Sequence, residues 1–103
     1  MTTKIENILE NRRETYGEFD EVAAVAQKLK KIISRYKNEN STLSLAAEES
    51  LDMILSKIAR IVCGNGKYID SWLDIAGYAK LISDTLEDSP TELFYRAAFL
   101  DTE

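Results

Sequence analysis

The sequence contains no histidine among its 103 residues. This absence removes the imidazole base of a catalytic triad, the most frequent transition-metal ligand and the usual proton carrier near neutral pH. Chemistry would have to come from carboxylates, lysine, arginine, tyrosine or a thiol. The single cysteine, Cys63, excludes an intrachain disulfide and favours a reducing compartment. Because it ends an apolar run and no histidine could activate it, we expect a buried structural thiol.

Glycine and proline are also scarce, with four and one residues, whereas 45% of the chain is hydrophobic and 30% is charged. This composition is too apolar for disorder and too interrupted by charge for a membrane span. The first residues lack the apolar segment of a secretory signal, so we expect a cytoplasmic protein that does not bind membranes. The length predicts one domain over residues 1–103. A net charge of −5 argues against general nucleic-acid binding.

Helical periodicity without a convincing strand pattern predicts an all-α fold, a small helical bundle of three main helices plus short N- and C-terminal helices. A capping box at Thr3 and Glu6 starts the first helix, and Gly17 ends it with a residue that tolerates positive φ. Ser44 is the expected N-cap of the third. The expected helices cover residues 4–16, 20–36, 45–63, 70–86 and 90–100.

The expected helix 70–86 has the clearest apolar stripe, suited to packing along neighbouring helices; the stripe comprises Trp72, Ile75, Ala79, Ile82 and Leu86. The core of so short a chain is small. The aromatic helix 90–100 would therefore cap the bundle or meet a second subunit, and we favour a homo-oligomer.

Two carboxylates and a tyrosine form one row on helix 70–86, since Asp70, Asp74 and Tyr78 are spaced four residues apart. Such a carboxylate pair could hold Mg²⁺ together with water and phosphate oxygens. The alternative is that both acids complement the positive end of the helix dipole.

The preceding helix carries Lys57 and Arg60, whose spacing lets both side chains contact phosphate oxygens. The alternative is a structural salt bridge of Arg60 with Asp70 or Asp74, because antiparallel packing brings these helices together. Tyr16 lies at a bend, where its ring could stack on a base.

Basic side chains also gather near the end of helix 20–36, where they complement the helix dipole and most simply form a solvated face; these are Lys28, Lys30, Lys31, Arg35 and Lys37. Residues 1–40 carry net charge +1 and residues 41–103 carry −6. The acidic excess therefore lies in the same part of the chain as Lys57 and Arg60.

Several blocks in this order resemble a family of small phage and prophage proteins of uncharacterised function. They are Arg-Glu-Thr-Tyr-Gly-Glu-Phe at 13–19, Lys-Ile-Ala-Arg at 57–60 and Asp-Ser-Trp-Leu-Asp-Ile-Ala-Gly-Tyr at 70–78. The resemblance covers about residues 8–82.

More distantly, the chain resembles the all-α nucleoside triphosphate pyrophosphohydrolases of MazG type, in which two acidic helices hold Mg²⁺ against a triphosphate. The resemblance implies that Glu49 and Asp52 stand for the first acidic pair, and Asp70 and Asp74 for the second. The second pair is spaced four apart rather than three, which favours binding over hydrolysis.

Three hypotheses follow. The first is a protein that binds a phosphorylated nucleotide through Tyr16, Lys57, Arg60 and Tyr78, sequestering a nucleotide signal, including a cyclic one, to counter host defence. The second is a Mg²⁺-dependent pyrophosphohydrolase with its metal at the four acids named above. The third is an adaptor without catalysis, whose polar residues serve only folding and protein contacts.

Overall fold

The computed structural model describes residues 3–86 and residue 98. Over residues 3–86 it contains four helices and no strand, which confirms the predicted all-α class and small helical bundle. The predicted boundaries agree to within about one residue, and the expected helix 90–100 lies outside the described residues. The helices are α1 (Lys4–Tyr16), α2 (Phe19–Tyr36), α3 (Leu45–Cys63) and α4 (Ile69–Thr85).

Two of these helices start where side-chain caps satisfy free backbone N–H groups. The Thr3 hydroxyl accepts from the Glu6 amide, and the Glu6 carboxylate accepts from the Thr3 amide, at 3.1 and 3.0 Å. Ser44 accepts from the amide of Ala47 at 3.0 Å. Both caps were predicted and are confirmed.

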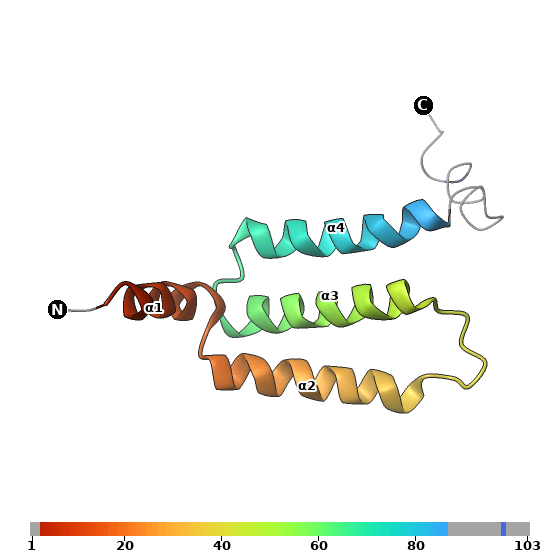
Figure 1. Cartoon of the computed structure of the whole chain (residues 1–103), viewed down its shortest axis with the longest axis horizontal. Coiled ribbons are helices and arrows are strands. Elements are labelled where there is room, and N and C mark those ends of the chain that lie inside the picture. Colours follow the sequence, from red (N-terminus) through yellow and green to blue (C-terminus); the bar gives the residue numbers. More distant parts are fainter. Residues whose placement is uncertain (1–2, 87–97, 99–103) are drawn as a thin grey trace.

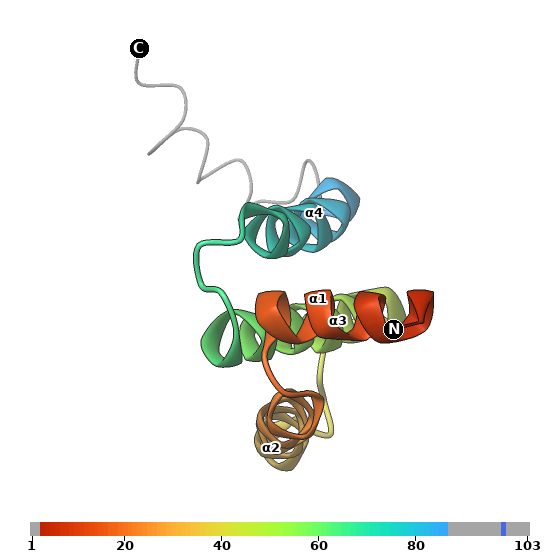
Figure 2. The same cartoon turned by 90° about the vertical axis from the view of Figure 1, so that its left-hand side faces the viewer.

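Helices α2, α3 and α4 lie side by side with α3 in the middle, and successive helices run in opposite directions (Figure 1). Helix α1 lies across the end of this layer at which α2 begins and α3 ends (Figure 2). The layer therefore has two broad faces, and α1 adds a wall at one end.

Two glycines permit the turn between α1 and α2 to pass directly over the end of α3. Gly17 has φ 93° and ψ 179°, a backbone region that is essentially restricted to glycine. A Cβ on Gly17 would lie 2.4 Å from the carbonyl oxygen of Cys63, and one on Gly64 would lie 2.3 Å from the carbonyl carbon of Tyr16. No larger residue fits this crossing without a backbone shift.

A backbone hydrogen bond holds the same crossing, because the amide of Asn65 donates to the carbonyl of Thr15 at 2.7 Å. The last turn of α1 is therefore attached to the segment that follows α3. Tyr16 is thereby placed beside the C-terminal turn of α3, which carries Arg60.

Small side chains form the buried contacts between the layered helices: Ala26, Ala47, Ser50, Ala59 and Ser71. Cys63 was expected to be buried, and the structure leaves it half-buried. Part of the predicted stripe of helix 70–86 lies towards α3, because Ile75 and Ile82 are half-buried and lie within about 40° around the helix of the buried Ser71. Trp72 and Leu86, from the same stripe, are exposed.

None of the described helices combines the length and the apolar character that a membrane span requires.

Candidate anion-binding groove

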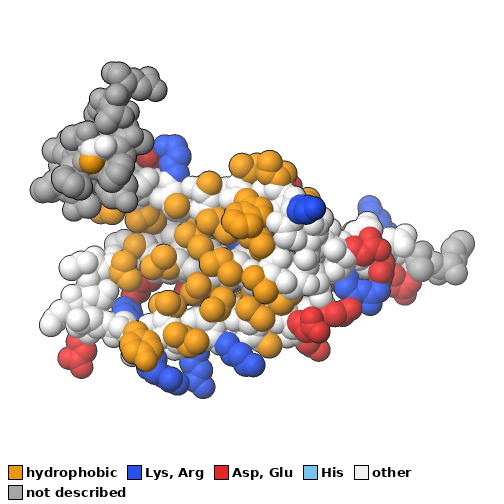
Figure 3. All heavy atoms as spheres, turned by 180° about the vertical axis from the view of Figure 1, so that it is seen from behind, with side chains coloured by type: hydrophobic (Ala, Val, Ile, Leu, Met, Phe, Trp, Pro, Cys, Tyr) orange, Lys and Arg blue, Asp and Glu red, His pale blue; other side chains and the backbone are white. Residues whose placement is uncertain are grey.

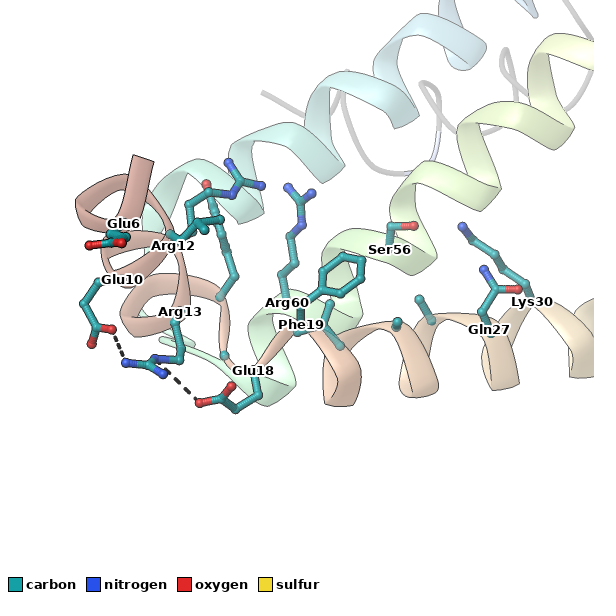
Figure 4. Close-up of a pocket in the computed structure, with 16 residues that line it drawn as sticks. Glu6, Glu10, Arg12, Arg13, Glu18, Phe19, Gln27, Lys30, Ser56 and Arg60 are labelled. Atoms are coloured by element: carbon teal, nitrogen blue, oxygen red, sulfur yellow. Dashed lines mark hydrogen bonds and ion pairs between the residues drawn. The ribbon is translucent and has the colours of Figure 1, made fainter. Parts of the chain in front are cut away.

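A groove of about 670 Å³ lies between α1, α2 and α3 (Figure 4). Helix α1 contributes Arg12, Arg13 and Tyr16, while α3 contributes Arg60 from its last turns. The floor and far wall come from α2, including Phe19 and Lys30. The groove thus gathers cations and aromatic rings from three separate helices.

Tyr16 is the centre of the cationic wall. The guanidinium carbon of Arg60 lies 4.8 Å from the centroid of the Tyr16 ring, and that of Arg12 lies 5.1 Å from it. Both distances fall in the range of cation–π attraction. The ring also meets Tyr68 edge to face, with centroids 5.8 Å apart and planes at 71°. These contacts fix Tyr16 and hold two guanidinium groups near one another.

The cations of the groove differ in their partners. Arg13 pairs with Glu10 and lies 3.6 Å from a carboxylate oxygen of Glu18. Both contacts are marked in Figure 4. Within residues 3–86, no ion pair includes Arg12, Arg60 or Lys30. No carboxylate of the described residues engages these three cations, so they can contact an incoming anion.

Two of the predicted ligand residues meet at the groove and two lie elsewhere. Tyr16 and Arg60 are in contact, as described above. The ammonium of Lys57 instead lies 2.8 Å from the carboxylate of Asp74, and only 13% of the Lys57 side chain is exposed. Tyr78 is half-buried on α4 and does not line the groove. The expected salt bridge between α3 and α4 exists, but it uses Lys57 rather than Arg60.

The four predicted metal ligands are spread over the molecule. Glu49 is exposed, and Asp52 is half-buried in a second groove beside Lys30 and Lys37. Asp70 accepts a hydrogen bond from the Tyr68 hydroxyl at 2.9 Å. In the described part of the chain, no group of three or more histidine, cysteine, aspartate or glutamate side chains is placed to hold a metal.

The hydrogen bond from Tyr68 to Asp70, together with the repulsion between a phenolate and that carboxylate, raises the pKa of Tyr68 from 10.0 to about 12. We expect Asp70→Asn to bring this pKa back towards 10, because the charged acceptor is lost. The measurement is an absorbance titration of phenolate, with a Tyr68→Phe variant to identify the signal. A Tyr68 pKa near 12 in both the natural and the Asp70→Asn protein would contradict the prediction.

Sequence reasoning missed Arg12 and Phe19, and assigned Lys30 to a solvated face. The spacing of Arg12 four residues before Tyr16 is a signal that could have paired them, since such side chains are neighbours on a helix. Nothing comparable marks Phe19, because its position depends on how α1 and α2 are joined.

Fold and site together define a small all-α protein with an arginine-rich groove at the junction of three helices. Residues 1–86 match the family model described as a domain of unknown function, DUF6378, and the chain belongs to that family. Comparisons with curated proteins and with solved structures give no match.

Proposed function

We propose that the protein binds a phosphorylated nucleotide in the groove between α1, α2 and α3. The observation that carries this proposal is the placement of Arg12 and Arg60 against one ring, Tyr16, at the wall of the groove. Guanidinium groups offer paired N–H donors whose geometry matches phosphate oxygens. Two of them held by one aromatic ring form a preorganised anion site.

Each part of a nucleotide finds a matching part of the groove. Arg12, Arg60 and Lys30 supply positive charge for the phosphates. Phe19 is 79% exposed and lines the same groove, so its ring offers a stacking surface for a base. Tyr16, in this assignment, positions the two arginines, and Phe19 rather than Tyr16 receives the base.

The geometry favours binding over hydrolysis. Asp74 is engaged by Lys57, and Asp70 accepts from Tyr68, so the second acidic pair has partners within the protein. A more specific part of the proposal starts from the resemblance of residues 8–82 to small phage proteins. In that part, the bound nucleotide is a signal, such as a cyclic oligonucleotide, and the protein sequesters it.

The test is a calorimetric titration of the full chain with nucleoside triphosphates, cyclic dinucleotides, cyclic trinucleotides and inorganic triphosphate, with and without Mg²⁺, followed by chromatography of the nucleotide. We expect saturable binding with the nucleotide recovered intact. Phe19→Ala should weaken nucleotide binding roughly 5- to 150-fold, the range expected for one stacked base, and leave inorganic triphosphate binding unchanged.

Two outcomes would overturn the proposal. The first is the absence of binding by every member of the panel at millimolar concentration. The second is Mg²⁺-dependent turnover that Asp74→Asn abolishes, which would identify a pyrophosphohydrolase instead.

A further inference from the structure

The layer of α2, α3 and α4 has two chemically different faces. The groove places Gln27 and Lys30 of α2, and Ser56 and Arg60 of α3, on one face. At about 100° per residue, the side chains of α3 and α4 that point the other way are mostly apolar. On α2, Val25 and Ile32 point that way beside the charged Glu21 and Lys28 at the edge of the layer. Seen from that side, hydrophobic side chains cover the middle of the layer across all three helices (Figure 3).

This apolar face includes large side chains that are between 41% and 80% exposed. They come from every helix of the layer: Ile32 and Tyr36 of α2, Leu51 and Val62 of α3, and Trp72 and Leu86 of α4. Half-buried apolar side chains lie between them: Val25, Leu29, Leu55, Ile58, Ile75 and Ile82. Among the described residues, the only apolar side chains that are buried are those of alanines.

The parts of this face on α3 and α4 carry little charge. The positions of α4 that point towards it have no charged residue. On α3, Glu48 lies seven residues before Leu55 and therefore on the same side of the helix, and its carboxylate pairs with Lys37. The indole N–H of Trp72 donates to the carbonyl oxygen of Gly66 at 2.8 Å, within the same chain. Covering this ring therefore leaves no indole donor without a partner.

The exposed area of these apolar side chains amounts to on the order of 800 Å² per copy, taking about 200 Å² for each fully exposed large side chain. A stable protein–protein interface buries roughly 800 Å² on each partner, and the largest apolar patch of a typical monomer is about 300–600 Å². The face therefore has the size of an interface.

We propose that a second copy of this chain covers the apolar face, so that two three-helix layers pack face to face. A second layer matches the width of three helices. Residues 87–103, which follow α4, could cover only a strip of this face, because a single helix is roughly 10 Å wide and the layer is three helices wide. In each copy, the groove between α1, α2 and α3 lies on the opposite face of the layer, so it stays open in such a dimer.

The experiment measures the mass of the full chain by light scattering after size-exclusion chromatography. We expect about twice the chain mass of 11.7 kDa. Val62→Lys, at the exposed end of α3, should give a monomer because it buries an unpaired ammonium. Ile32→Lys, nearer the edge of the face, should weaken the dimer at least tenfold.

Leu73→Lys is the matched control. Leu73 is 58% exposed, and it lies about 200° around α4 from the buried Ser71, so it points away from α3 rather than onto the apolar face. This variant adds the same charge and should remain a dimer. Circular dichroism of each variant checks that helices are retained.

A second measurement requires no variant, since the melting temperature of a dimer that unfolds on dissociation rises with protein concentration. We expect this rise for the natural chain between about 1 and 100 μM. A chain that is monomeric throughout this range, or a natural dimer whose mass Val62→Lys and Ile32→Lys leave unchanged, overturns the proposal. A monomer would leave the face to the C-terminal segment or to another protein.

Discussion

Replacing Gly64 by alanine is expected to lower the free energy of unfolding by about 3 kcal/mol, the upper end of the usual cost of overpacking. The added Cβ would lie 2.3 Å from the carbonyl carbon of Tyr16, 2.4 Å from the carbonyl oxygen of Thr15 and 2.5 Å from the Cα of Tyr16. All three are backbone atoms, which cannot rotate aside as a side chain can. The crossing of the α1–α2 turn over α3 must open, and urea denaturation measures the loss.

Gly77→Ala is the matched control for this prediction. A Cβ on Gly77 meets nothing within 4 Å, and the residue lies inside α4. Alanine is about 1 kcal/mol more favourable than glycine in a helix interior, so the same substitution should raise stability there. Equal stabilities of the Gly64→Ala and natural proteins would show that the two segments do not cross so closely.

The same crossing explains which parts of the fold were predictable from the sequence. Helix starts at Thr3 and Ser44 depend on hydrogen bonds to residues three positions along the chain, and the stop at Gly17 depends on its own φ. Such local rules are visible in a single sequence. The approach of Gly64 to Tyr16 joins segments about fifty residues apart, and no local pattern encodes it.

Partner choice was the main feature that the sequence left open. Lys57 and Arg60 differ by about 60° around α3, too little for periodicity to decide which one faces α4. In the structure, Lys57 pairs with Asp74, and the Arg60 guanidinium lies against the Tyr16 ring. Arg60 could not have been assigned to Tyr16 without knowing that α1 lies across the end of α3.

The apolar stripe of α4 shows a different limit. Its spacing predicted helix packing, but period alone does not say whether the partner helix belongs to the same chain. Within the chain, α4 presents Ser71 to α3, because a small side chain lets the two helices approach closely. Ile75 and Ile82 are half-buried on the same side as Ser71, and the exposed members Trp72 and Leu86 are left for the face that we assign to a second copy.

Arg60→Ala is expected to weaken nucleotide binding roughly 10- to 150-fold, as measured by calorimetry. Hydrogen bonds to charged groups contribute about 1.5–3 kcal/mol each, and 1.4 kcal/mol corresponds to a factor of ten. Arg60 has no carboxylate partner among residues 3–86, so its loss removes a cation that is available to the phosphates. Tyr16 would also lose one of its two guanidinium contacts.

Arg13→Ala tests whether position in the groove or mere positive charge accounts for this effect. Arg13 lines the same groove and has the same side chain, but Glu10 and Glu18 already engage it. We therefore expect a change of less than about threefold, the range of an exposed charge that is neutralised by neighbours. If the two variants lose affinity equally, the nucleotide responds to the overall charge of the groove, and the specific role assigned to Arg60 against the Tyr16 ring is wrong.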